Sequence, residues 1–208
     1  MKLAIETHGH GPSLVLIHGM GSAATAWKPI IPELAKHFQV ITVDLPGHGR
    51  TPYSPIQQMD PISLAKLIIR NLKDIGIEEF DLVANSLGGW ISFEMAVLNP
   101  DSVKSITALA PAGLWLTPFT SRYPGELALR MMASGVEKLA PSLLNYTWAK
   151  RIGFETVSPR WKELSYEICL DATSAMAQSP GYFPAWDALL GKRFDKQIST
   201  EIPITIIF

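Results

Sequence analysis

Four short apolar runs alternate with segments of helical periodicity between residues 13 and 110, and this alternation constrains the fold most strongly. The runs are residues 13–17, 39–43, 80–84 and 103–110, and the helical segments are residues 24–37, 61–75 and 87–98. The runs are continuous rather than alternating, as is typical of strands buried on both faces. The order predicts an α/β fold with a mostly parallel sheet that helices cover on both faces.

The pattern changes after residue 113. Residues 114–200 have no clear β-period and contain helix-compatible segments separated by prolines, among them residues 142–150 and 161–176. Four of the six tryptophans of the chain lie in this stretch. An apolar run resumes only at residues 202–208. We therefore expect a core over residues 1–113, a mainly helical cap inserted over residues 114–200, and a returning core strand over residues 201–208.

Composition narrows the classes of partner. Lysine and arginine number 18 against 19 acidic residues, so no strongly basic face for nucleic acid is expected. The single cysteine, Cys169, excludes an internal disulfide framework and any cysteine-rich metal site. No run reaches the roughly 18 apolar residues of a membrane span, and the first residues lack the apolar stretch of a signal peptide. A soluble, cytoplasmic protein with no membrane contact is expected.

The segment Val83–Gly89, with the sequence Val-Ala-Asn-Ser-Leu-Gly-Gly, lies between a predicted strand and a predicted helix. A serine on such a turn, here Ser86, is held at the carboxyl end of the sheet, where ligands bind in open α/β folds. The residues beside it are small, as a close approach of strand and helix requires. Leu87 begins the helix, so its N–H is expected to point toward the group that reacts with Ser86. The alternative is a tight turn with a helix-capping serine.

A glycine turn, His18-Gly-Met-Gly21, directly follows the first buried run. A negative charge that develops on an oxygen needs two converging N–H groups, and Met20 and Leu87 are the expected pair. In isolation this segment could equally be a plain glycine turn. The turn directly follows the first buried run, where the second N–H donor of an oxyanion hole is expected, and this position favours the catalytic interpretation.

These motifs resemble those of capped members of the α/β-hydrolase superfamily, over essentially the whole chain. The nucleophile elbow Gly-x-Ser-x-Gly is present as Ala84-Asn-Ser-Leu-Gly88, with alanine in place of the first glycine. His18–Gly21, followed by Trp27, resembles the oxyanion loop of the family. Asp44–Thr51 resembles the loop after the next strand, with threonine where serine is usual. The cap and the Asn-Ser-Leu-Gly-Gly form are similar to carbon–carbon bond hydrolases, carboxylesterases and cofactor-free haloperoxidase-like enzymes.

The resemblance implies a serine hydrolase that cleaves an ester or similar acyl bond, including a carbon–carbon bond, without cofactor or metal. Ser86 would be the nucleophile, and the oxyanion hole would be Met20 and Leu87. A serine at this position disfavours epoxide hydrolase and haloalkane dehalogenase chemistry, which use aspartate there. The substrate would be a small, apolar, ester-like molecule, with no nucleic acid as partner. The residues expected to line its pocket are Gly19, Trp115, Phe119 and Trp186.

A serine nucleophile needs a base and an acid, which in this fold follow it along the chain, acid first and histidine last. All five histidines lie within the first 48 residues, and the last apolar run ends at residue 208. We therefore expect that the last strand and helix of the fold are missing and that residues 1–208 alone are inactive. The alternatives are a separate piece that supplies these groups, or a non-catalytic relative that binds a ligand or protein partner through the cap cleft. His18, His48 and Asp44 are interpreted as structural members of their loops.

Overall fold

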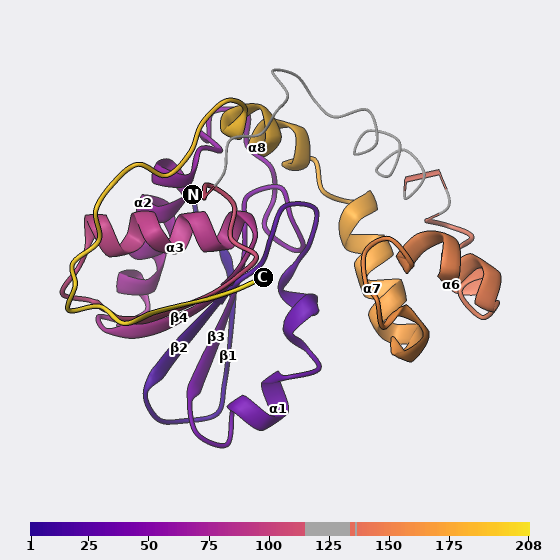
Figure 1. Ribbon diagram of the computed structural model, residues 1–208, viewed down its shortest axis with the longest axis horizontal. Helices are drawn as coiled ribbons and strands as arrows, with labels where there is room; N and C mark the ends of the chain where they lie inside the picture. Colours follow the sequence, from indigo (N-terminus) through magenta and orange to yellow (C-terminus); the bar gives the residue numbers. More distant parts are fainter. Residues whose placement is uncertain (115–133, 136) are drawn as a thin grey trace.

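The computed structural model describes residues 1–114, 134, 135 and 137–208, and the account below concerns these residues (Figure 1). They contain a six-stranded sheet with the order β1-β3-β2-β4-β5-β6. The strands are β1 (Ala4–His8), β2 (Ser13–Ile17), β3 (Gln39–Asp44), β4 (Phe80–Asn85), β5 (Val103–Leu109) and β6 (Ile204–Ile207). β1 is antiparallel to β3, and the other neighbouring strands are parallel. The predicted α/β architecture with a mostly parallel sheet is confirmed.

Helices lie on both faces of this sheet and beyond it. Those between the strands are η1 (Ala24–Trp27), α1 (Ile31–Leu34), α2 (Pro61–Asp74) and α3 (Leu87–Leu98). Those after β5 are α5 (Ala140–Leu143), α6 (Thr147–Phe154), η2 (Trp161–Glu163), α7 (Tyr166–Ala177) and α8 (Tyr182–Leu189). Figure 1 shows α2 and α3 together on one face of the sheet, α1 on the other, and α6 and α7 away from the sheet.

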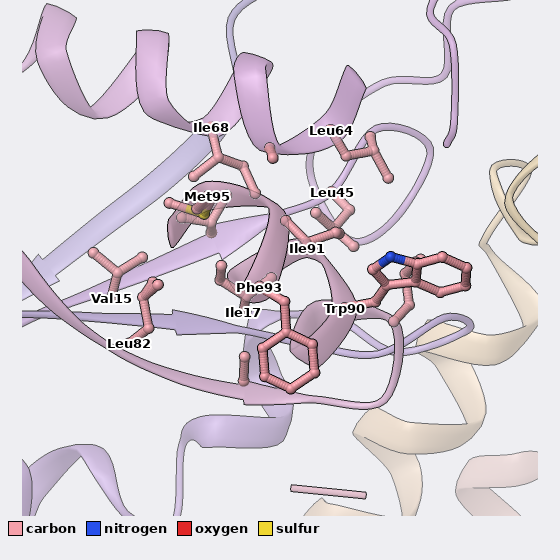
Figure 2. Close-up of a cluster of buried hydrophobic side chains, with 14 of the residues drawn as sticks. Val15, Ile17, Leu45, Leu64, Ile68, Leu82, Trp90, Ile91, Phe93 and Met95 are labelled. Atoms are coloured by element: carbon pink, nitrogen blue, oxygen red, sulfur yellow. The ribbon is translucent and has the colours of Figure 1, made fainter. Parts of the chain in front are cut away.

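The continuous apolar run of β2 is explained by cover on both faces. Successive side chains of a strand point to opposite faces. Val15 and Ile17 belong to the large buried cluster under α2 and α3, where Figure 2 shows Ile68 of α2 close to Met95 of α3. The intervening leucines of β2 belong to a second cluster, which contains Trp27 of η1. Both faces of this strand are therefore core.

The segment of residues 24–37 differs from the single helix that its periodicity predicts. It forms η1 and the one-turn helix α1, with Pro29 between them. Proline lacks an N–H, and its ring clashes with the carbonyl four residues earlier, so a continuous α-helix cannot pass through it. The Ile30 N–H instead donates to the Trp27 carbonyl, three residues back, at 3.0 Å. Here the local backbone chemistry of proline overrides the apolar pattern.

The described chain between residues 137 and 189 is mainly helical, but its helices are shorter than the sequence predicts. The segment 142–150 divides into α5 and α6 at Tyr146, whose backbone is extended. The segment 161–176 divides into η2 and α7, and the Ser165 hydroxyl caps α7 by accepting from the Ile168 N–H at 3.2 Å. The division of the chain into core and cap stays a prediction.

After α8, the chain returns along α3 and is fixed there by a buried carboxylate. The Phe194 ring lies 5.4 Å from the Phe93 ring, measured between centroids. Glu94, 3% exposed, accepts from the Trp90 Nε1–H at 3.2 Å and pairs with Lys196 Nζ at 2.5 Å. A buried carboxylate is stable only when hydrogen-bond and charge partners replace the water that it loses. The ion pair of Lys196 with Glu94 therefore holds the returning segment against α3.

We expect Lys196→Met to lower the free energy of unfolding by about 1–3 kcal/mol, because it leaves Glu94 buried with one partner fewer. Urea denaturation of the purified chain measures this change. The control is Lys192→Met, an exposed lysine four residues earlier for which no ion pair is found among the described residues. Equal unfolding midpoints for the two variants would contradict this role of the ion pair.

Candidate active site

Ser86 occupies a strained turn between the end of β4 and the start of α3. Its φ of 51° and ψ of −114° lie outside the regions that a residue with a side chain normally adopts. The Ser86 N–H donates to the Leu109 carbonyl at 2.9 Å, and the Ser86 carbonyl accepts from the Ala112 N–H at 2.9 Å. The main chain is therefore held on both sides of the serine. Strain that the surrounding structure maintains in this way is typical of functional positions.

The turn depends on two glycines in the first turn of α3. A Cβ atom at Gly88 would lie 2.4 Å from the Ile17 carbonyl oxygen, and one at Gly89 would lie 2.6 Å from Pro111 Cβ. Neither distance is compatible with a side chain. The start of α3 is thus in direct contact with the end of β2, which brings the loop after β2 to Ser86.

The loop of residues 18–21 passes beside the serine. A Cβ atom at Gly19 would lie 3.0 Å from Ser86 Cβ and 2.9 Å from Asn85 Oδ1. The structure therefore brings together the two motifs that the sequence separates by more than 60 residues. Met20 follows Gly19 in this loop, and Leu87 is the first residue of α3, so the helix itself provides no partner for the Leu87 N–H.

The Ser86 hydroxyl does not cap the helix. Its side chain makes no capping hydrogen bond to the N–H groups of α3, so the alternative interpretation as a capping serine is not supported. Among the residues that the structure describes, no hydrogen-bond partner of this hydroxyl is found.

His18 lies next to this site, but both of its ring nitrogens are engaged elsewhere. Nε2 accepts from the Leu45 N–H at 3.1 Å, and Nδ1 lies 2.7 Å from the Gly19 carbonyl oxygen. Because Leu45 offers a proton and Gly19 offers only a lone pair, the ring carries its proton on Nδ1. Burial lowers the pKa of His18 below its ordinary value, while the bond to Gly19 and the charge of Asp44 raise it less. His18 is therefore a neutral, fully bonded ring rather than a base for Ser86.

Asp44 braces the loops around His18. Its carboxylate accepts from the Ala24 N–H at 2.7 Å through Oδ1 and from the Arg50 N–H at 3.0 Å through Oδ2. A Cβ atom at Gly49 would lie 2.3 Å from this carboxylate. Asp44 thus ties the loop after β2 to the loop after β3, as the sequence interpretation expects. His48 is also fully buried, and its ring lies 5.5 Å from the His18 ring.

Of the expected pocket residues, the structure describes Gly19, beside Ser86, and Trp186 on α8. Trp186 is half-buried, and its ring stacks at 6.4 Å on the ring of Tyr182. Trp115 and Phe119 lie outside the described residues. Met176 and Tyr182 are further neighbours of this loop that the sequence does not predict, and they come within 2.8 and 3.0 Å of a Cβ atom placed on Gly21. No sequence signal connects these residues, because more than 150 positions separate them from the loop.

The described part of the chain shows neither a metal-binding cluster nor a membrane-spanning helix. No group of three or more histidine, cysteine or acidic side chains there is arranged to hold a metal ion. None of the helices described is both long and apolar enough to span a bilayer.

Comparisons with known proteins identify related sequences. A family model described as alpha/beta hydrolase fold matches residues 12–194. The chain is 31% identical to a pimeloyl-[acyl-carrier protein] methyl ester esterase of Aeromonas hydrophila over 140 residues, which are 67% of this chain and 52% of that protein. It is 30% identical to a monoacylglycerol lipase of Xenopus laevis over 121 residues, which are 57% of this chain and 36% of that protein. The chain thus spans about half of the first relative and less of the second.

A solved structure shows the same fold. The crystal structure of N-formylmaleamic acid deformylase from Pseudomonas putida S16 matches with a TM-score of 0.72 and 18% identity. The match covers 97% of this chain and 76% of the deformylase. The agreement extends over nearly all of the chain, so the fold described above is one that solved proteins adopt.

Gly88→Ala should destabilise the protein by several kcal/mol, because the added methyl group meets the Ile17 carbonyl oxygen at 2.4 Å. Gly153→Ala is the matched control: Gly153 lies in α6 with no atom within 4 Å of an added Cβ. It should be stabilising by about 0.5–1 kcal/mol, as expected for alanine in a helix. Thermal unfolding of both variants measures the difference, and equal stability would show that α3 and β2 do not meet closely.

The buried neutral state of His18 predicts a pH dependence of stability. The pKa of His18 in the folded protein is lowered from 6.5, so below this pH the unfolded chain binds a proton that the folded chain does not. The His18 contribution is therefore complete above 6.5 and is lost as the pH falls toward the folded pKa, with a slope of at most about 1.4 kcal/mol per pH unit.

Urea denaturation between pH 7.5 and pH 5.5 tests this expectation. His18→Gln should reduce the pH slope, whereas the control His37→Gln, at an exposed histidine, should retain it. An unchanged slope in His18→Gln would contradict the assignment of a neutral buried ring.

Proposed function

Because this chain belongs to the α/β hydrolase fold family, we propose that it is a serine hydrolase that cleaves an ester or similar acyl bond with Ser86 as the nucleophile. The observation that carries the proposal is the strained Ser86 turn, which lies beside Gly19 and whose hydroxyl is not used for helix capping. Backbone strain of this kind at a residue with a side chain clusters at functional sites.

In this mechanism, Ser86 Oγ attacks the carbonyl carbon of the substrate and gives a tetrahedral intermediate. The negative oxygen accepts hydrogen bonds from the Met20 and Leu87 N–H groups, which form the oxyanion hole. Collapse of the intermediate expels the alcohol and leaves an acyl-Ser86, which water then hydrolyses. A general base takes the proton from Ser86 and a protonated base returns it to the alcohol. Among the described residues, no histidine ring is hydrogen-bonded to Ser86.

The substrate class proposed is a small or medium-sized apolar ester. The relatives support the ester bond, since one is named for a methyl ester and the other for a monoacylglycerol. The Trp186 and Tyr182 rings on α8 support it as well, because they bring aromatic surface toward the loop of residues 18–21. We propose that Gly19, Trp186, Trp115 and Phe119 line the substrate pocket. We also propose that residues 114–200 form a helical cap. A cytoplasmic location and independence from cofactors stay predictions from the sequence.

A second candidate is a non-catalytic relative that binds a ligand in the same place. The specific observation in its favour is that the described residues bring no base to the Ser86 hydroxyl. The two functions differ in what they require of Ser86: a hydrolase needs its hydroxyl, whereas a binding protein needs only the shape around it.

We expect Ser86→Ala to abolish covalent modification by a fluorophosphonate probe. Mass spectrometry of the peptide that contains residue 86 locates the modification. Because no base among the described residues is hydrogen-bonded to Ser86, residues 1–208 should be modified slowly. They should hydrolyse p-nitrophenyl esters only at the level that the oxyanion hole and binding supply, about 10³–10⁴ over water.

The matched control is Ser63→Ala, a half-buried serine in α2, which should be modified like the unchanged protein. Modification that survives Ser86→Ala would refute Ser86 as the nucleophile. An unmodified wild-type chain that still binds an apolar ester would favour the binding function.

A further inference from the structure

The direction of the Met20 N–H is fixed by the carbonyl of the residue before it. Gly19 C=O and Met20 N–H belong to one planar peptide unit, and no cis peptide bond is found among the described residues. In a trans peptide these two groups point in opposite directions. Whatever holds the Gly19 carbonyl therefore also aims the Met20 N–H.

The shorter of the two hydrogen bonds of the Gly19 carbonyl is with the His18 ring. His18 Nδ1 lies 2.7 Å from the Gly19 oxygen, and the Ser22 N–H donates to the same oxygen at a longer 3.2 Å. The His18 ring is 1% exposed and is held from the opposite side by the Leu45 N–H at 3.1 Å. A buried ring bonded at both nitrogens has little freedom to turn, so it is a rigid support for the carbonyl.

The loop needs such a support because glycines flank Met20 on both sides. Gly21 has a φ of 71°, which glycine adopts without strain. Two glycines around one residue leave its peptide free to rotate unless other groups hold it. An N–H that waits for a transition state must be aimed before the reaction, because reorienting it during the reaction costs activation energy.

We propose that His18 is a positioning residue, which aims the Met20 N–H at the oxyanion through its hydrogen bond to the Gly19 carbonyl. This inference rests on the proposed function, because it gives a role to a residue that does not touch the reacting atoms. It also explains why the loop begins with a fully buried histidine whose ring is hydrogen-bonded to Gly19 and Leu45 rather than to Ser86.

The groups around the ring keep its proton on Nδ1. The Asp44 carboxylate lies 3.9 Å from Nε2 but already accepts from two main-chain N–H groups and lies 3.6 Å from Arg50 Nε. The His48 ring lies at 5.5 Å. Since the Leu45 N–H points at Nε2, a proton there would face another proton. The tautomer that donates to Gly19 is thus the one that the surroundings select.

Two substitutions of His18 distinguish the effects of its two hydrogen bonds, one to Gly19 and one to Leu45. His18→Asn places an amide N–H near the position of Nδ1, so it retains the donor to Gly19 and loses the acceptor for Leu45. His18→Gln places an amide oxygen near the position of Nε2, so it retains the acceptor for Leu45 and loses the donor to Gly19. Both remove the ring, and His18→Asn, one methylene shorter, leaves the larger cavity, so a loss of packing alone would weaken His18→Asn more.

The first readout is the rate at which Ser86 is modified by the fluorophosphonate probe. His18→Asn should stay within about threefold of the wild-type rate, and His18→Gln should fall by at least about tenfold, since a misaimed oxyanion donor costs 10-fold or more. A structural role alone predicts equal loss in both variants, or greater loss in His18→Asn. Either of these results would overturn the proposal.

Two further readouts do not depend on the chemistry of Ser86. Hydrogen exchange of the peptide that contains Met20 should be faster in His18→Gln than in His18→Asn. Long-range proton–nitrogen NMR of the wild-type chain should show the His18 ring protonated on Nδ1. If the wild type does not react, the proposed function fails, and these readouts still decide the positioning role. A ring protonated on Nε2 would overturn it, even if neither variant folds.

Discussion

The close contact between the start of α3 and the end of β2 is the constraint on which the site depends. At Gly88 a single additional carbon would lie 2.4 Å from the Ile17 carbonyl oxygen. The helix therefore begins directly against the strand, and the residue before the helix, Ser86, lies next to the residues after the strand. Interiors are packed too densely to accept an extra methyl group without displacement. The candidate site depends on this close approach of the main chain of α3 at Gly88 to the main chain at the end of β2.

Buried polar side chains then hold the loops that surround this contact. Asp44 and His18 bind main-chain groups of both loops, and the Thr51 hydroxyl donates to the Asp44 carbonyl at 2.7 Å. Thr51 Oγ1 also accepts from the Ala4 N–H at 2.8 Å, which connects the loop to β1. Burying such groups is costly unless they are hydrogen-bonded. Their bonds make the loops a rigid base, which a preorganised oxyanion hole requires.

The end of α7 and the start of α8 rest on these same loops. Met176 at the end of α7 contacts Gly21, and the Gly181 N–H, just before α8, donates to the Gly47 carbonyl at 3.1 Å. Glycine at both loop positions permits this approach, because a side chain there would occupy the space that the helices fill. The region expected to select the substrate is therefore in contact with the loops that would perform the chemistry.

The sequence by itself determined the four strands between residues 13 and 110, the helices α2 and α3, the turn at Ser86 and the structural role of Asp44. These follow from local signals: continuous apolar runs, glycines at close approaches and a polar residue at a strand end. It failed at residues 24–37, where Pro29 overrides the periodicity. Only the tertiary structure decided the strand order, the contact of Met176 with the loop and the tautomer of His18. The physical reason is distance along the chain: His18 receives its hydrogen bond from Leu45, 27 residues away, and no local pattern records which groups folding will bring together.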